Sequence, residues 1–142
     1  MRKINYQSLK VGKILPNVEE AFHTSFAYDV NIYYFEQDLN ALASKHPNSY
    51  LKMVEEISRI LENPDIVCYM RKDLVFTYFR LYIDKKGIKV LGVNVRLCGH
   101  PNKWVIGGAK WYDNASLIAM QEEGEFRRIP PKKKKVSKKE NQ

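Results

Sequence analysis

The chain of 142 residues is long enough for one domain and too short for two full hydrophobic cores. Apolar residues make up 44% of it and aromatic residues 12%, which suffices for a packed core. Its apolar runs are far shorter than the roughly 18 residues of a membrane span, and its first residues lack the apolar stretch of a signal peptide. These features predict a soluble, cytoplasmic protein without membrane contact.

The net charge of +8 is unevenly distributed along the chain. Of the 24 Lys and Arg residues, eight lie between Arg127 and Lys139, where no Asp or Glu occurs; the other 16 equal the 16 acidic residues in number. The excess charge therefore belongs to the C-terminal segment, and a cationic site on the folded part must come from the arrangement of its charges. Cys68 and Cys98 lack metal-site spacing and are expected to be reduced thiols.

The first third of the chain gives mixed signals. Residues 11–15 are typical of a short strand that ends at Pro16, and the aromatic and β-branched residues 22–34 predict one strand or two short ones. A helix is expected at residues 36–45, stopped by His46-Pro47.

The clearest element is a second helix that begins after Asn48 or Ser49, either of which can cap it. Apolar residues recur along it at helical spacing from Tyr50 to Leu61, and Asn63-Pro64 ends it.

After Pro64 the apolar period changes to two, which predicts strands at 66–70, 74–83, 88–97 and 103–112. The segment Asp84-Lys85-Lys86-Gly87 forms a turn in which Gly87 takes positive φ. The predicted fold is α+β: two helices followed by a four-stranded antiparallel meander.

A short helix at 115–123, capped by Asn114 and ended by Gly124, closes the predicted domain of residues 1–128. Residues 129–142 form a Lys-rich segment that cannot bury apolar surface and is predicted to be disordered.

The strands carry a candidate nucleic-acid surface. On the strand 103–112, Trp104 and Ile106 share a side with Lys110 and Tyr112. If the mixed sides of the three long strands face the same way, one surface would hold Tyr78, Arg80, Tyr82, Asn94, Arg96, Lys110 and Tyr112. Tyrosines interleaved with cations suit single-stranded nucleic acid, since bases stack on rings and cations hold phosphates. An ordinary solvated sheet face has the same composition, and that alternative stays open.

The sequence holds no Gly-rich phosphate loop and no acidic cluster for magnesium, so neither metal nor cofactor is expected. Among the three histidines, His46 is the best-placed candidate for a general base, beside Lys45 at the junction of the two helices. A nuclease with these residues would use the ribose 2′-OH as nucleophile and stabilise the charged phosphorane with Arg or Lys.

Residues 31–112 resemble the phage-associated members of the barnase–EndoU–colicin–RelE group, which are small metal-independent ribonucleases. The motifs that carry this resemblance are Lys45-His46-Pro47, the helix to Leu61, Glu62-Asn63-Pro64-Asp65 and the closing strand with Trp104-Val105-Ile106. The resemblance implies that His46 is catalytic with Lys45 beside it. By topology it places Arg80, Arg96 and Lys110 among the active-site cations.

Two positions depart from that pattern: Ala41 stands where relatives often carry a further His, and Gly107 where they often carry Thr. Two functions are therefore expected from the sequence. One is a metal-independent endoribonuclease, a toxin or phage effector that an antitoxin or host protein partner would control. The other is an inactive RNA- or protein-binding module, such as a phage-encoded inhibitor of a host nucleoprotein complex.

The basic C-terminal run would add phosphate attraction that is independent of base sequence and falls with salt, through Lys132, Lys133, Lys134 and Lys135.

Overall fold

The computed structural model describes residues 8–26, 30–98 and 103–129. In these residues it contains β1 (Ser8–Lys13), α1 (Pro16–Ala21), β2 (Asn31–Phe35), α2 (Glu36–Lys45), α3 (Tyr50–Glu62), β3 (Ile66–Met70), β4 (Val75–Asp84), β5 (Gly87–Cys98), β6 (Lys103–Tyr112), α4 (Asn114–Glu123) and β7 (Glu125–Arg128). The predicted α+β class is confirmed. No helix of the described residues is long and apolar enough to cross a membrane.

The sheet is larger than predicted and is mixed rather than purely antiparallel. Its seven strands follow the order β1-β2-β6-β5-β4-β3-β7. The predicted meander is present as the antiparallel neighbours β3 to β6. It is extended at one end because β2 pairs parallel with β6, through Ile32↔Trp104 and Tyr33↔Val105, and at the other because β7 pairs with β3. Both extensions join segments distant in sequence, for which the local pattern carries no signal.

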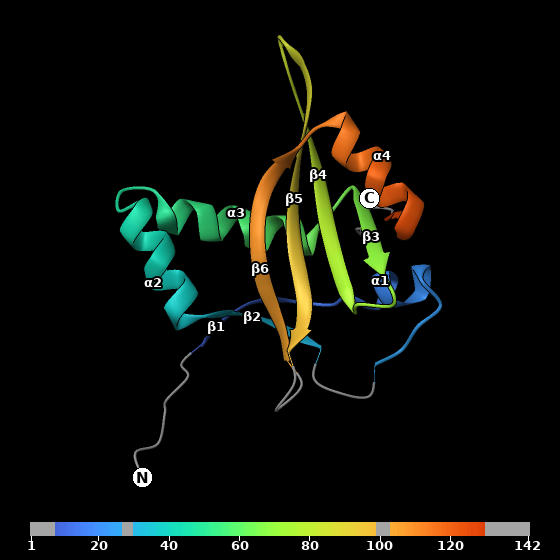
Figure 1. Ribbon diagram of the computed structural model, residues 1–142. Coiled ribbons are helices and arrows are strands. Elements are labelled where there is room, and N and C mark those ends of the chain that lie inside the picture. Colours follow the sequence, from blue (N-terminus) through green and yellow to red (C-terminus); the bar gives the residue numbers. More distant parts are fainter. Residues whose placement is uncertain (1–7, 27–29, 99–102, 130–142) are drawn as a thin grey trace, which may run out of the picture.

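The two central helices lie where the sequence predicts them. Helix α2 ends at His46, whose backbone N–H donates to the Leu42 carbonyl, and α3 ends at Asn63, before Pro64. Helix α3 has Ser49 in the N-cap position, without a side-chain cap bond, and buries Val54, Ile57, Ile60 and Leu61. Helix α2 lies at the side of the molecule (Figure 1), and none of its residues is completely buried.

Several predictions at the two ends of the chain need correction. The first strand begins at Ser8, and Pro16 starts helix α1, where its fixed φ suits the first turn. Among the described residues of the predicted strand region 22–34, strand structure is confined to Asn31–Tyr34, which belong to β2. Phe22 instead caps α1 and is fully buried. The cap of α4 is Asp113 rather than Asn114, because the Asp113 carboxylate accepts the Ser116 N–H at 2.8 Å.

The sequence predicts no element for residues 125–128, and in the structure they form an edge strand. Ile129, placed by the sequence in the Lys-rich tail, is only 5% exposed, and its N–H donates to the Asp65 carbonyl at 3.2 Å. The prediction for the remaining tail, including Lys132 to Lys135, lies outside the described residues.

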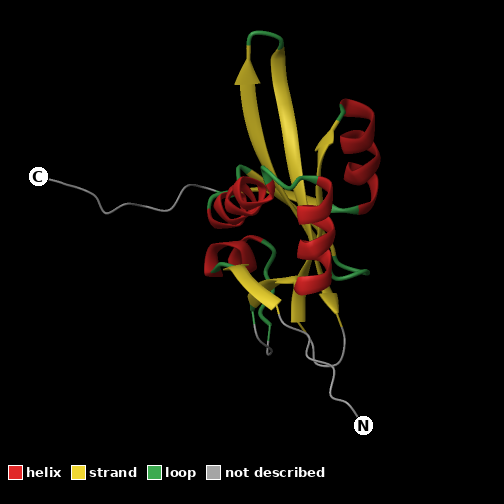
Figure 2. Ribbon diagram, turned by 90° about the vertical axis from the view of Figure 1, so that its left-hand side faces the viewer, coloured by secondary structure: helices red, strands yellow, loops and turns green. Residues whose placement is uncertain are grey.

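The sheet has an inner face that packs on the helices α1 and α3 and an outer face that is partly covered by α4 (Figures 1 and 2). The inner face holds the main core, in which the rings of Tyr69 and Phe76 stack 4.2 Å apart and Phe26 contacts Trp104 at 5.1 Å. Under α4, a smaller outer cluster forms where Phe79 stacks on Phe126 with ring centroids 5.9 Å apart.

The two cysteines are free thiols, as predicted, and they differ in burial. Cys68 is fully buried, and burial, with the nearby Glu125 charge, raises the pKa of its thiol to about 12. Because the thiolate is the reactive form, Cys68 should resist alkylation at pH 8 while the half-buried Cys98 reacts. Counting modified thiols in native and in denatured protein checks this: one is expected to react first, and equal rates for both would contradict the fold.

Candidate nucleic-acid interface

The predicted surface is split by the register of β4 against β5. Residues directly opposite each other in a ladder point to the same face of a sheet. Tyr78 lies opposite Val93 and Arg80 opposite Leu91, so both side chains lie on the inner face. Asn94 lies opposite Thr77, on the outer face. The prediction that the mixed sides of β4 and β5 share one surface is therefore wrong, because the register differs by one residue from the one it requires.

A bulge in β6 likewise separates side chains that the sequence placed on one face of this strand. The partner of Asn94 is Gly108 and that of Val95 is Ile106, which leaves Gly107 as the extra residue. A bulge reverses the alternation of side chains along a strand. Trp104 and Ile106 therefore enter the inner core, whereas Lys110 and Tyr112 point outward.

On the inner side, the candidate residues of β4 are engaged with the protein itself. Tyr78 is fully buried, and burial raises the pKa of its hydroxyl. The Tyr82 hydroxyl donates a hydrogen bond to the Glu56 carboxylate of α3, and the Tyr82 ring contacts the Trp111 ring edge-on at 5.7 Å. Burial raises the pKa of the Tyr82 hydroxyl to about 12, and the hydrogen bond to Glu56 is the next largest cause. Arg80, beside Tyr82, is half-buried. Tyr78 and Tyr82 are therefore structural residues rather than parts of an open binding face.

His46 and Lys45 are exposed at the C-terminal end of α2, at the far side of the molecule from α4 in Figure 1. Arg96 and Lys110 lie on the outer face of the sheet and Arg80 on the inner face. The structure does not bring these four candidate catalytic residues together around one phosphate. The catalytic assignment of His46 stays a prediction from the sequence motif.

The outer face does unite Asn94, Arg96, Lys110 and Tyr112. Tyr112 lies across Gly92, where an added Cβ would come within 2.5 Å of its ring, and its edge meets Phe79 at 5.2 Å. Asn94 accepts the Thr77 hydroxyl at 2.7 Å and is hydrogen-bonded to Tyr112. Burial raises the pKa of Tyr112, although the Asn94 bond acts in the opposite direction. Asn94 thus positions the Tyr112 ring, and the Lys110 ammonium lies 5.0 Å from the centre of that ring.

Three cations and a tyrosine that the sequence did not single out, Lys10, Lys13, Lys103 and Tyr33, complete this face. Lys103 of β6 lies opposite Cys98 of β5, and Arg96 of β5 lies opposite Val105 of β6. Val105 is also paired with Tyr33 of β2, at the other edge of β6, so these side chains share the outer face. The next strand brings Lys10 opposite Tyr33 and Lys13 opposite Asn31. We name as the cationic belt the outward side chains of four neighbouring strands: Lys10, Lys13, Tyr33, Arg96, Lys103, Lys110 and Tyr112.

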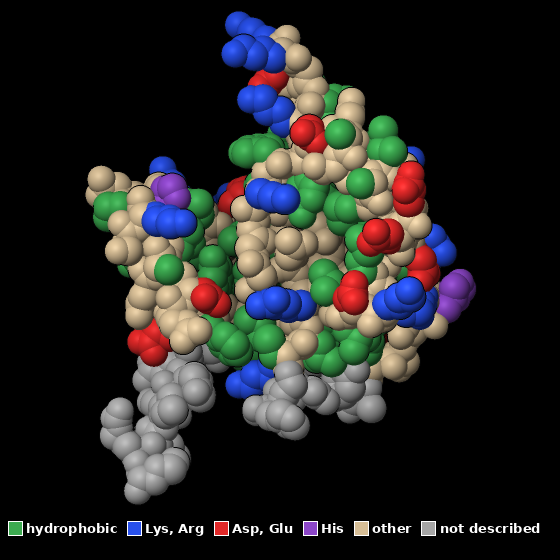
Figure 3. Space-filling view, viewed as in Figure 1, with side chains coloured by type: hydrophobic (Ala, Val, Ile, Leu, Met, Phe, Trp, Pro, Cys, Tyr) green, Lys and Arg blue, Asp and Glu red, His purple; other side chains and the backbone are tan. Residues whose placement is uncertain are grey.

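Charge is separated between helices and strands throughout the described residues. The four helices hold nine acidic and three basic residues, whereas the seven strands hold two acidic and nine basic ones. The strands of the belt, β1, β2, β6 and β5, contain no Asp or Glu. Figure 3 shows the outer face: Lys and Arg side chains lie over β5, β6 and the tip of the β4–β5 hairpin, and carboxylates lie mainly over α4.

Two lysines of the belt sit over tyrosine rings. The Lys103 ammonium is 4.8 Å from the Tyr33 ring centre and Lys110 is 5.0 Å from that of Tyr112. Each pair places a cation beside an aromatic face, the combination that binds a phosphate and a neighbouring base. Lys103 and Lys110 are seven residues apart on one strand, about 23 Å at ordinary strand rise. The belt is therefore long enough for several nucleotides.

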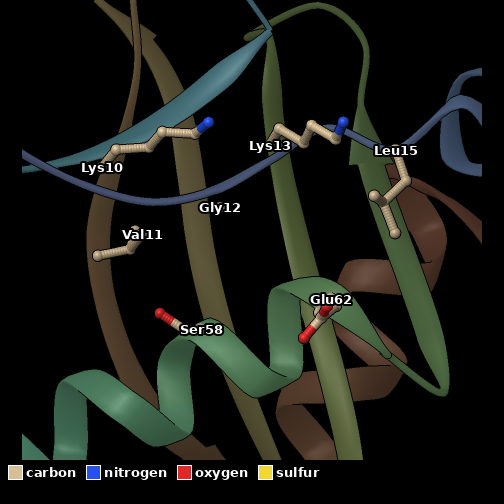
Figure 4. A pocket seen from close by; sticks show the side chains of 7 residues that line it. All are labelled: Lys10, Val11, Gly12, Lys13, Leu15, Ser58 and Glu62. Carbon is tan, nitrogen blue, oxygen red and sulfur yellow. The ribbon is translucent and has the colours of Figure 1, made fainter.

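At the β1 end of the belt lies a pocket of about 300 Å³. Lys10 and Lys13 form one rim, and Ser58 and Glu62 of α3 the other, as Figure 4 shows. The β1 bulge brings Gly12 so close to α3 that an added Cβ would lie 3.1 Å from Leu61. The two ammonium groups extend away from Glu62 in this view, which leaves them open to an anion.

Within the described residues, no group of three or more His, Cys, Asp or Glu is arranged to hold a metal ion. The chain matches no protein-family model, and no curated protein or solved structure matches it either. The resemblance to the metal-independent ribonuclease group therefore rests on the sequence motifs alone.

Proposed function

We propose that this protein binds single-stranded RNA along the cationic belt. The observation that carries the proposal is that four neighbouring strands contain no carboxylate and that three of them, β1, β5 and β6, turn Lys or Arg side chains outward. Phosphates would lie on Lys103, Lys110 and Arg96, and bases on the Tyr33 and Tyr112 rings. Lys132 to Lys135 would strengthen the attraction without selecting a base sequence.

Binding rather than cleavage is favoured by the distribution of the candidate catalytic groups. A general base must lie within hydrogen-bond reach of the proton it takes, with cations at the same phosphate. His46 is on α2, and the cations are divided between the two faces of the sheet. This supports an RNA-binding module, the second of the two functions expected from the sequence.

The test is the salt dependence of binding to a labelled single-stranded RNA. For single strands, log K falls with log salt by about 0.7 per phosphate contact. Lys103→Gln/Lys110→Gln should therefore reduce the slope by about 1.4 and weaken binding at 0.1 M salt about 25-fold. Fluorescence anisotropy over a salt series measures both quantities, and a DNA strand of the same sequence shows whether the 2′-OH contributes.

Lys52→Gln/Arg59→Gln is the matched control, since it removes the same charge from exposed positions of helix α3, outside the belt. It should change the slope little. Equal losses in both double variants would show that binding depends on net charge alone and would refute the belt. Denaturing gels of the same RNA in EDTA report cleavage: fragments ending in a cyclic phosphate, lost in His46→Ala, would establish the ribonuclease instead.

A further inference from the structure

The β4–β5 hairpin projects beyond the rest of the sheet (Figures 1 and 2). Pairing of β4 with β3 ends at Phe79, and pairing of β5 with β6 ends where Val90 meets Tyr112. The segment from Leu81 to Lys89 is thus a two-stranded ribbon without neighbouring strands. The ribbon therefore extends the outer face of the sheet beyond the end of the cationic belt.

The outer side of this ribbon is aliphatic and open to solvent. The cross-strand pairs there are Leu81↔Val90 and Ile83↔Ile88. Leu81 is 40% exposed, Ile83 80% and Ile88 66%. The main core contains none of these three side chains, so the fold does not require them to be apolar. Neighbouring exposed apolar side chains of this kind mark a contact surface.

The tip of the hairpin is positively charged. Lys85 and Lys86 form the turn, and both are exposed. The only carboxylate in the ribbon, Asp84, lies 3.5 Å from the Lys89 ammonium and accepts the Lys86 backbone N–H at 2.8 Å. Asp84 and Lys89 therefore offset each other, which leaves the two turn lysines as net positive charge.

The aliphatic patch continues directly into the belt. Val90 lies opposite Tyr112 on the outer face, and Lys110 lies over that ring. Leu81, Ile83 and Ile88 thus lie between a cationic aromatic group at the base of the hairpin and two lysines at its tip. A ligand on this surface must offer negative charge at both ends and apolar area between them.

We propose that the hairpin is a second RNA contact and that it binds unpaired nucleotides: Lys85 and Lys86 hold phosphates while bases pack against Leu81, Ile83 and Ile88. This inference rests on the proposed function, and it specifies in addition that the RNA bound at the hairpin is unpaired. Base faces are accessible only where bases are unstacked, and aliphatic side chains are known to insert against such bases. A duplex would offer the lysines its phosphates but would hide the apolar area of its bases.

The experiment compares a single-stranded RNA with a duplex of the same sequence. Ile83→Ser/Ile88→Ser should weaken binding of the single strand about ten-fold, since burying one such side chain is worth that much or more. The salt slope should stay unchanged because no phosphate contact is lost. Duplex affinity should not change. Lys85→Gln/Lys86→Gln should instead lower the slope by about 1.4.

Ile118→Ser is the matched control, because Ile118 of α4 is 58% exposed but lies outside the hairpin. All of these positions are exposed, so the variants should keep native stability within about 0.5 kcal/mol, which thermal unfolding checks.

Two results would overturn the inference while leaving the belt intact. One is an unchanged single-strand affinity in Ile83→Ser/Ile88→Ser when Lys103→Gln/Lys110→Gln does weaken binding. The other is loss of self-association in sedimentation with unchanged RNA affinity, which would assign the aliphatic face to a second copy of the chain. If wild-type protein binds no RNA, the proposed function itself fails, and this differs from both results.

Discussion

Trp104→Ala is expected to lower the free energy of unfolding by about 3–5 kcal/mol, the usual cost of removing a large aromatic side chain from a core. Trp104 is fully buried and lies at the junction where β6 meets β2, opposite Ile32. Its ring contacts Phe26 at 5.1 Å and Phe76 at 5.4 Å. The cavity left by alanine would lie in the main core, whose surrounding side chains relax only partly into it. Urea denaturation measures the loss.

The same strand supplies the control, since Trp111 is 58% exposed. Trp111→Ala removes the same group and should cost about 1 kcal/mol or less, mainly through lost contact with Tyr82. Trp104→Phe should cost much less than Trp104→Ala, because the indole N–H has no hydrogen-bond partner in the described structure. Equal costs at positions 104 and 111 would contradict the burial of Trp104 and the exposure of Trp111.

Gly92→Val is expected to cost about 1–3 kcal/mol of stability and to disturb the belt as well. A Cβ at this position would lie 2.5 Å from the Tyr112 ring and 2.9 Å from the Phe79 ring, well inside contact distance. Phe79 is held by its stack on Phe126, so Tyr112 is the side chain that must move. Its movement would break the Asn94 bond and separate the ring from Lys110.

Urea denaturation and RNA affinity, measured on the same variant, check this prediction. Gly107→Ala is the control: its Cβ would lie 3.5 Å from the Asn94 side chain, an ordinary contact. It should change stability by less than about 1 kcal/mol and leave RNA binding intact. If Gly92→Val is as stable as wild type, Tyr112 does not lie across the sheet at this point.

Local patterns alone predict several elements closely. The bounds of α2 and α3 follow from apolar spacing and from Pro47 and Pro64, which cannot continue a helix. The strands from 66 to 112 follow from alternation, and Gly87 indeed takes φ of 125° in the turn. All of these features depend on neighbours within a few residues, so the sequence carries their signal.

The candidate surface could be predicted only in part. Alternation groups the residues of β4 and of β5 correctly, but it does not indicate which side of the neighbouring strand they join. Gly107-Gly108 is a signal for a bulge that alternation overlooks, and it places Lys110 outward while Trp104 points inward. For the antiparallel pair β1–β2 no local pattern indicates a place beside β6, so Lys10, Lys13 and Tyr33 could not be assigned to the surface.

The sequence thus determined helices α2, α3 and α4, the central strands and the presence of cations and tyrosines on those strands. Only the tertiary structure decided which of these side chains share a face. Register, bulge and parallel pairing set that outcome, and each depends on contacts between residues far apart in the chain. A one-residue shift in register moves every side chain of a strand to the other face, which is why Tyr78 is a core residue and Lys103 belongs to the belt.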